Sequence, residues 1–323
     1  MKSAQDLYNF IYKACDYLRG PVGHESFKDY LTPLLYYIGL QPIWEGLIGV
    51  YSEFAKVCDK YGLKYYVTDG NALGAVRHGG FIPWDDDLDV SMPRPDYEKF
   101  LEIAAGELPS NLKIVRWQNT PEYNFLFAKV QETRREYVEG IEKASGRMLS
   151  NGIYIDIFPI DGFPASKLTL VMFRIKFAIL KVLLRFQCDK LSRQTTKGKI
   201  VWLAGLLLAP FFPWLWGQAR IMRRMEALTR KLSFDDSTLT GRSWNDSGLF
   251  FYPPYPKEVW GVSSKQKIGD VMLAFPSDIK KFLEIRYGDY MQLPPMEQQR
   301  PAHQYSWRCP WWLGPTKPCA ADK

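Results

Sequence analysis

The chain has 323 residues, 46% of them hydrophobic and 24% charged, a balance that is typical of globular proteins and excludes a disordered chain. Its net charge of +7 is uneven, because residues 162–232 hold 14 Lys and Arg against two acidic residues and the remainder is net negative. The positive charge therefore marks one local surface, and a general nucleic-acid footprint is not expected.

Residues 1–60 are expected to be helical. They lead into an amphipathic stretch at 43–61, whose apolar side chains recur at helical spacing, and Gly62 supplies the stop signal. Residues 1–20 alternate apolar and charged side chains and lack the continuous apolar run of a secretory signal. The five cysteines form no Cys-x-x-Cys pair, so we expect free thiols, no structural zinc site and a cytoplasmic location.

After Gly62 the pattern alternates between short strands and helices. Five segments rich in β-branched and aromatic residues are predicted strands: 63–68, 84–91, 112–117, 125–131 and 152–158. Residues 69–71 are expected to turn the chain before a short helix at 72–77, and Pro95 is expected to open a helix that reaches Ala105. The predicted class is a mixed α/β fold with a small sheet.

Four carboxylates fall within five positions at the second predicted strand: Asp85, Asp86, Asp87 and Asp89. Side chains alternate between the two faces of a strand, so Asp87 and Asp89 are expected to point the same way. Two like charges on one face are costly to bury unless a cation neutralises them, and Mg²⁺ is an oxygen-liganded ion that commonly brings phosphates with it. Asp87 and Asp89 are therefore predicted metal ligands, with Asp85 and Asp86 in a turn or supporting role. The alternative is a solvated acidic turn.

Three more charged residues lie in or near predicted apolar strands. Asp156 lies in a strand too apolar to hold an unpaired carboxylate, so it is the predicted third metal ligand and catalytic carboxylate. Asp161, after Pro159, is expected in a turn and is the alternative third carboxylate. Lys129 is a cation in an apolar strand, and we expect it to meet a buried phosphate or a carboxylate.

Residues 166–232 combine basic and apolar character. Four cations recur at a spacing that places them on one stripe of a helix: Lys167, Arg174, Lys181 and Arg185. Residues 200–217 then hold no charge, but Pro210 and Pro213 would break a straight helix, and both flanks are basic. In-plane or re-entrant membrane association fits this pattern best, with a buried core hairpin and a true span as the alternatives.

The tract Gly-Asn-Ala-Leu-Gly-Ala-Val-Arg-His-x-Gly-Phe-Ile-Pro-Trp-Asp-Asp-Asp-Leu-Asp-Val, residues 70–90, resembles the signature of the LicD/fukutin-type phosphotransferases. Two further stretches, 155–162 and 286–291, match other pieces of that family. The resemblance implies a nucleotidyltransferase-like core and divides the chain into five parts. These are a helical segment (1–60), the catalytic core (61–165), a basic and apolar helical membrane-associated segment (166–232), the C-terminal part of the family domain (233–305) and a tail (306–323).

The resemblance also assigns residues around the carboxylates. Gly70 and Asn71 are implied to bring backbone N–H groups close to the donor phosphates, since a bare glycine permits close approach. Arg77 is expected to bind a phosphate unless it is a surface arginine, and His78 is expected at the rim. For the C-terminal motif we derive no catalytic role and expect structural pairing: Arg286, Tyr287 and Asp289.

The function implied by the resemblance is transfer of a phospho-alcohol group, phosphocholine above all, from a CDP-activated donor to a sugar hydroxyl of a cell-surface glycan. The glycan would be lipopolysaccharide, teichoic acid or capsule. The expected cofactor is Mg²⁺ or Mn²⁺, as two ions on Asp87, Asp89 and Asp156. The expected partners are a CDP-alcohol, a glycan or lipid-linked glycan acceptor and the inner face of the cell membrane, without nucleic acid. The alternatives are a nucleotidyltransferase that releases pyrophosphate and a non-catalytic membrane scaffold.

Overall fold

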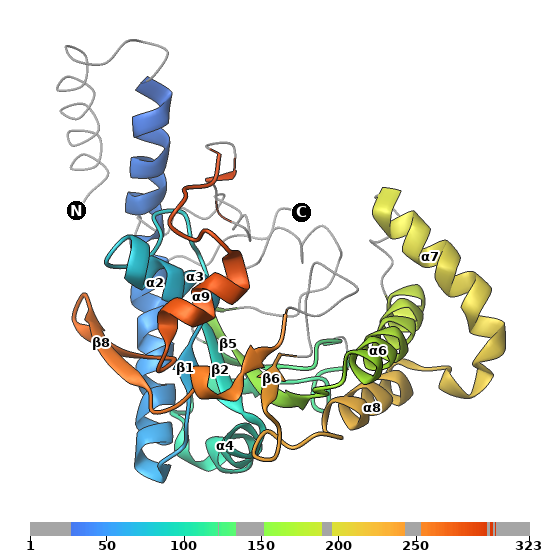
Figure 1. The fold of residues 1–323 in the computed structure, drawn as a ribbon. Coiled ribbons are helices and arrows are strands. Elements are labelled where there is room, and N and C mark those ends of the chain that lie inside the picture. Colours follow the sequence, from blue (N-terminus) through green and yellow to red (C-terminus); the bar gives the residue numbers. More distant parts are fainter. Residues whose placement is uncertain are drawn as a thin grey trace, which may run out of the picture.

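A computed structural model describes residues 27–121, 123–133, 152–188, 196–242, 253–295, 298–299 and 301 of the chain (Figure 1). Strands and helices alternate along these residues, so the predicted mixed α/β class is confirmed. The predicted tail at 306–323, residues 1–26, and the side chains of all cysteines except Cys58 lie outside the described part.

The main sheet is mixed, with seven strands among the described residues. Their bounds are β1 Tyr66–Val67, β2 Asp89–Pro93, β3 Leu112–Val115, β4 Ala128–Glu132, β5 Tyr154–Phe163, β6 Leu239–Gly241 and β7 Tyr255–Pro256. The order is β1-β2-β5-β4-β3, with β6 joined to the second half of β5 and β7 joined to β6. Only the β2–β5 pair is parallel among these described strands. β5, buried over its whole length, is the strand around which the sheet is built.

One face of the sheet is covered by α2 (Phe27–Tyr61) and α4 (Arg94–Glu107), which pack against each other. α2 also packs against β4 and β5, and α4 packs against β2, β3 and β5. The predicted amphipathic stretch is confirmed, because its periodic side chains are all buried: Leu47, Val50, Phe54 and Cys58. Gly62 ends α2 with a φ of +63°, a left-handed conformation that favours glycine. Cys58 is a free thiol, as expected, and burial raises its pKa.

The opposite face carries a second core under α6 (Lys167–Cys188) and α8 (Gln218–Thr229). Phe158 of β5 and Val115 of β3 contribute to it from the sheet. The helices contribute seven buried side chains: Phe173, Phe177, Leu183, Leu184, Ile221, Met222 and Met225. Phe158 lies two residues beyond Asp156 on the same strand, so the two side chains share a face. The helical layer therefore begins directly beside the predicted catalytic carboxylate.

The C-terminal part returns to this body. A hairpin of β8 (Ser264–Ile268) and β9 (Val271–Phe275) follows the short turn η4 (Lys257–Val259), and β9 lies beside β1. The last described helix, α9 (Ile279–Tyr287), packs beside α3 (Asp69–Arg77) (Figure 1). Segments far apart in the sequence thus meet at the start of α3.

Two predicted turns belong to regular elements. The segment 69–71 is the first turn of α3 and not a separate turn, although Asp69 itself has a φ of +50°. Asp161 lies within β5, opposite Gly241, because β6 returns and extends the pairing of that strand. The prediction of a turn at Asp161 was therefore wrong.

The predicted basic stripe of α6 does not face solvent as a unit. Lys181 is only 2% exposed, because this side of the helix turns toward the second core. An apolar stripe is exposed instead: Leu168, Val171, Met172 and Ile175. The spacing identified the stripe correctly, but the burial of its members follows from the packing of α6 on the sheet and α8.

The uncharged stretch 200–217 is broken at its prolines, as predicted. α7 (Thr196–Leu208) gives way to the short turns η2 (Ala209–Phe211) and η3 (Pro213–Leu215), each of which contains a proline. Most of its large apolar side chains are exposed, so the buried-hairpin alternative was wrong. None of the helices in the described ranges combines the length and the apolar character needed to cross a bilayer.

Candidate active site

Strand register brings three predicted site residues together on one face of the sheet. Asp89 of β2 lies opposite Asp156 of β5, and Asp156 lies opposite Lys129 of β4. Residues at paired positions of neighbouring strands project to the same face. The three side chains therefore form a row across β2, β5 and β4, although they come from distant parts of the sequence.

The acidic loop before β2 continues this face. Asp85, Asp87 and Asp89 are half-buried, whereas the residues between them are fully buried, which is the alternation of an extended chain. The prediction that Asp87 and Asp89 share a side agrees with this pattern, but β2 begins only at Asp89, so Asp87 precedes the strand. Asp86 is fully buried, which the sequence did not indicate.

Asn71 fixes the backbone of this loop. Its side-chain amide donates a hydrogen bond to the carbonyl of Asp87 at 2.9 Å, and its side-chain oxygen accepts one from the N–H of Asp89 at 2.8 Å. One side chain of α3 thus bonds to the backbone of both predicted metal ligands. The contacts that the structure gives Asn71 are with the carboxylate loop, so we infer that it positions Asp87 and Asp89.

Gly70 allows a close approach between α3 and the same loop. A Cβ at this position would lie 2.3 Å from Oδ2 of Asp85, which is closer than non-bonded atoms approach. The residue must therefore be glycine for Asp85 to lie where it does. A second loop contact comes from α2, since the indole N–H of Trp44 donates to the Asp85 carbonyl at 2.7 Å.

Asp69, at the start of α3, is held by two arginines that the sequence did not connect to it. Arg286 of α9 donates to its Oδ1 at 2.6 Å, and Arg242, at the end of β6, pairs with its Oδ2. Burial by itself would raise the pKa of Asp69, but the two guanidinium groups outweigh it and lower that pKa. The expected structural pairing is confirmed for Arg286 and for Tyr287, whose ring centroid lies 4.9 Å from the guanidinium carbon of Arg286, while Asp289 is exposed.

Asp89 has the opposite electrostatic surroundings. Its partial burial and the nearby carboxylates of Asp87, Asp69 and Asp156 raise its pKa well above the usual range, and Arg242 opposes the rise only in part. A carboxylate in such a setting stays ionised more readily when a cation joins it. The donor set, hard carboxylate oxygens on one face, thus fits Mg²⁺ or Mn²⁺. No three carboxylate, imidazole or thiol groups among the described residues are already close enough to hold an ion.

Lys129 is buried and meets a carboxylate, one of the two partners expected for it. Its Nζ lies 3.3 Å from Oδ1 of Asp156 and 3.3 Å from the ring centroid of Tyr154. The ammonium is therefore held between an acid and an aromatic face. It supplies a fixed positive charge next to the predicted third ligand.

Arg77 and His78 lie at the end of α3, away from the row of carboxylates and lysine. Arg77 donates from Nη1 to the carbonyls of Tyr290 and Gln292, at 3.1 and 3.2 Å, and so ties the segment after α9 to α3. His78 packs edge-on against Trp84, and burial followed by the charge of Arg77 lowers its pKa. These contacts are structural.

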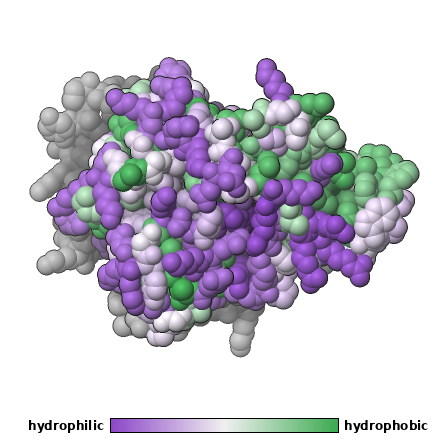
Figure 2. Space-filling view, turned by 60° about the horizontal axis from the view of Figure 1, so that its bottom comes forward, coloured by the Kyte–Doolittle hydropathy of each residue, from purple (hydrophilic) through white to green (hydrophobic). Residues whose placement is uncertain are grey.

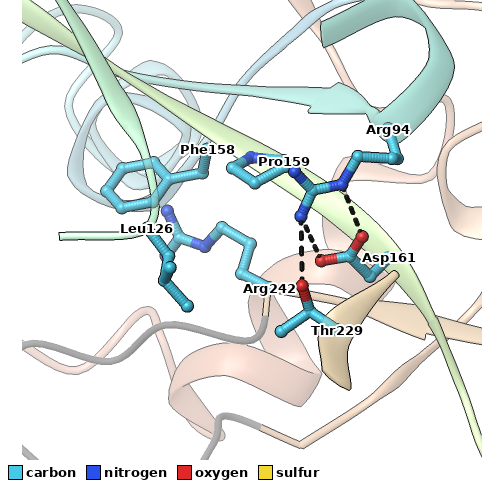
Figure 3. Close-up of a pocket in the computed structure, with 7 residues that line it drawn as sticks. All are labelled: Arg94, Leu126, Phe158, Pro159, Asp161, Thr229 and Arg242. Atoms are coloured by element: carbon cyan, nitrogen blue, oxygen red, sulfur yellow. Dashed lines mark hydrogen bonds and ion pairs between the residues drawn. The ribbon is translucent and has the colours of Figure 1, made fainter. Parts of the chain in front are cut away.

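Asp161 belongs to a separate buried ion pair (Figure 3). The Nε and Nη2 atoms of Arg94 each donate to one oxygen of Asp161 at 2.7 Å, and Arg94 also reaches Thr229. Asp161 is 1% exposed. Beside this pair, Arg242 lies over the ring of Phe158, 4.1 Å from its centroid, next to a cavity of about 10 Å³. Asp161 thus forms a bidentate ion pair with Arg94 that joins β5 to α4, and we call this pair the fork.

Comparison with known proteins gives a consistent picture. A model of the LicD/FKTN/FKRP nucleotidyltransferase domain matches residues 62–169. The lipopolysaccharide cholinephosphotransferase LicD of Haemophilus influenzae is 27% identical over 257 residues, which cover 79% of this chain and 92% of that protein. The ribitol 5-phosphate transferase FKRP of Homo sapiens is 30% identical over 86 residues, 26% of this chain and 17% of that protein. Residues 62–169 are therefore similar to the LicD/FKTN/FKRP nucleotidyltransferase domain, and the resemblance first noted in residues 70–90 is confirmed.

Proposed function

We propose that this chain is a metal-dependent phosphotransferase that moves a phospho-alcohol group from a CDP-activated donor to a sugar hydroxyl of a cell-surface glycan. The observation that carries the proposal is the register that sets Asp89 beside Asp156 and Asp156 beside Lys129. The printed names of both relatives describe transfer of a phosphorylated alcohol, cholinephosphate or ribitol 5-phosphate. Phosphocholine is the group we infer first, because the similarity to LicD extends over far more of the chain.

In this proposal Asp87, Asp89 and Asp156 would hold one or two Mg²⁺ or Mn²⁺ ions, which would supply positive charge to stabilise the donor diphosphate. Asn71 keeps the first two carboxylates in place through its pair of backbone hydrogen bonds. Lys129 is the donor-binding residue that the geometry supports best, since its ammonium lies on the same face as the carboxylates. The structure gives contacts within the protein to three residues that were first expected to bind the donor: Arg77, Asn71 and Gly70. Direct donor contacts from them are therefore secondary in the proposal.

The transfer balances as a single displacement. The acceptor hydroxyl oxygen forms a bond to the phosphorus that carries the alcohol, and the bond from that phosphorus to the CMP oxygen breaks. CMP leaves with the electron pair, and a carboxylate of the Asp87, Asp89 and Asp156 set accepts the hydroxyl proton.

The test is ³¹P NMR of the purified protein with CDP-choline, CDP-ribitol, CDP-glycerol or CTP in Mg²⁺ or Mn²⁺, with and without a glycan acceptor. We expect CMP to accumulate with one of these donors and no pyrophosphate to appear. Pyrophosphate released from CTP would instead establish the nucleotidyltransferase alternative. Absence of turnover with every donor and acceptor would favour the scaffold.

We also infer that the protein works at the inner face of the cell membrane as a peripheral protein. The support is a group of exposed apolar side chains on α6 and α7 flanked by basic residues. A catalytic site that modifies lipid-linked glycans would need such a location.

A further inference from the structure

An apolar surface lies on α7 and the two turns that follow it. Seven large side chains are exposed there, among them Leu207 at 65% and Phe211 at 71%. The set is Ile200, Leu203, Leu206, Leu207, Phe211, Trp214 and Trp216. Figure 2 shows the corresponding hydrophobic area on the side of the molecule where Figure 1 places α6 and α7. Single exposed apolar residues are ordinary, but a contiguous group of this kind marks an interaction surface.

The exposed stripe of α6 continues this surface. Leu168, Val171, Met172 and Ile175 recur at helical spacing and are all about half exposed or more. We call the two sets together the α6–α7 apolar face.

The two helices that carry this face, α6 and α7, are closely packed against each other. α7 packs against α6, and a Cβ at Gly205 would lie 2.4 Å from the Cβ of Phe186, so glycine permits the close approach. The ring of Phe186 also contacts Trp202 and Trp216, with centroids 5.9 and 6.4 Å away. The inner side of α7 is thus occupied by α6, and its outer side bears the exposed residues.

Over the described residues of α6, of α7 and of α8 as far as Met225, the charged side chains are all basic. Residues 164–188 and 196–225 contain no Asp or Glu at all. Six exposed basic side chains lie in the same ranges: Lys167, Lys176, Lys199, Arg220, Arg223 and Arg224. An apolar face with a purely cationic border complements a surface that is apolar inside and anionic at its boundary.

We propose that the α6–α7 apolar face docks in the plane of an anionic membrane leaflet. The indole rings of Trp214 and Trp216 suit the boundary between headgroups and acyl chains, where tryptophan is enriched. The prolines in the turns that follow α7 interrupt the apolar run, so it does not continue as one straight helix. A second copy of the chain fits less well, because a two-fold interface would set one cationic border against another.

Docking of this face would place the candidate active site close to the leaflet. The core beneath α6 and α8 includes Phe158, which shares a strand and a face with Asp156. This step rests on the proposed function: the acceptor would be a lipid-linked glycan held at the same surface. Membrane docking itself does not depend on catalysis and is tested separately.

The test is flotation of the full chain with vesicles of phosphatidylcholine alone or with 30% phosphatidylglycerol. We expect flotation with the anionic vesicles, loss of most of it in 0.5 M NaCl, and weak binding to the neutral ones. Each basic residue near an anionic surface contributes on the order of fivefold, so Arg220→Gln, Arg223→Gln and Arg224→Gln together should weaken binding about a hundredfold.

Two matched double variants separate the docking surface from general hydrophobicity. Leu207→Gln with Phe211→Gln should abolish flotation. Val262→Gln with Met272→Gln, at positions 88% and 50% exposed around the β8–β9 hairpin, should float like the wild type. Circular dichroism checks that both variants are folded.

Equal flotation of the two variants, or equal binding to neutral and anionic vesicles, would overturn the proposal. If sedimentation shows that the wild type is a dimer and that only the Leu207/Phe211 double variant is a monomer, the face would instead bind a second copy of the chain. Flotation without transferase activity would support the docking surface and contradict the proposed function. Activity on a soluble acceptor without flotation would support the proposed function and contradict the docking surface.

Discussion

Asp69 and Asp89 are neighbouring carboxylates with opposite surroundings. Asp69 lies between Arg242 and Arg286, which lower its pKa despite burial. Asp89 has its pKa raised by partial burial and by the other carboxylates of the site. Ionised Asp69 therefore stabilises the fold, and ionised Asp89 destabilises it when no cation is bound.

Replacement of Asp69 by Asn should destabilise the protein by about 3 kcal/mol at pH 7, because two buried guanidinium groups lose their shared partner. A lowered folded pKa means that the stabilisation is complete above the unfolded value of about 4 and is lost as the pH falls through the folded value. The difference in unfolding free energy from the wild type should thus shrink below pH 4. Urea unfolding between pH 2.5 and 7 measures it, and a difference independent of pH would contradict the assignment.

Replacement of Asp89 by Asn should have the opposite sign. Without divalent ions, Asp89→Asn should raise the midpoint of thermal unfolding at pH 7, since it removes repulsion that grows as the pH rises from the unfolded pKa through the raised folded pKa. Below pH 4 the two proteins should melt alike. Mg²⁺ should then stabilise the wild type and leave the variant unchanged. A variant less stable than the wild type at pH 7 in EDTA would contradict this prediction and show that ionised Asp89 has a stabilising partner in the fold.

At the scale of elements, α3 positions the carboxylate loop through Asn71. Asn71→Ala removes both hydrogen bonds to the loop, at a cost of about 1–3 kcal/mol. Because the loop carries two predicted ligands, the Mg²⁺ concentration needed for half-maximal activity should rise more than the donor KM. Titration of turnover with Mg²⁺ checks this, with Ser52→Ala on α2 as a control that loses one local hydrogen bond. A change in donor KM alone would instead place Asn71 at the donor.

The fork between Arg94 and Asp161 joins α4 to β5 away from the carboxylate row. Arg94→Met should cost about 3–5 kcal/mol of unfolding free energy, because it leaves Asp161 buried without its partner. Arg94→Lys keeps the charge but loses the two-pronged geometry, so its loss should be intermediate. Denaturant unfolding gives both values. Turnover per folded molecule should stay near that of the wild type. Loss of turnover in the Lys variant would instead indicate that Asp161 is the third catalytic carboxylate.

The elements show which parts of this architecture a sequence can specify. The shared side of Asp87 and Asp89 follows from the period of an extended chain, and the burial of Phe54 and Cys58 follows from helical spacing. The placement of Asp161 in β5 depends on pairing with Gly241, whose position no local pattern encodes. Burial of Lys181 likewise follows from how α6 packs, so spacing predicted which cations share the stripe but not which of them are buried.

At the scale of the whole molecule, the site is assembled from long-range contacts. Asp69 and Arg286 are 217 residues apart in the chain, and the row of Asp89, Asp156 and Lys129 exists only through strand register. The resemblance of residues 70–90 to a known signature indicated where chemistry would occur. It could not indicate that Arg242 and Arg286 converge on Asp69, because such convergence is a property of the folded chain and not of any segment.

The most direct test of the account is divalent-ion binding measured by the electron paramagnetic resonance signal of free Mn²⁺. The wild type should bind Mn²⁺, and Asp89→Asn and Asp156→Asn should each bind it at least about tenfold more weakly. Asp270→Asn, which neutralises a fully exposed carboxylate elsewhere, should bind it like the wild type. Equal Mn²⁺ affinity in all four proteins, or none in the wild type, would contradict a metal-dependent transfer centre on β2 and β5.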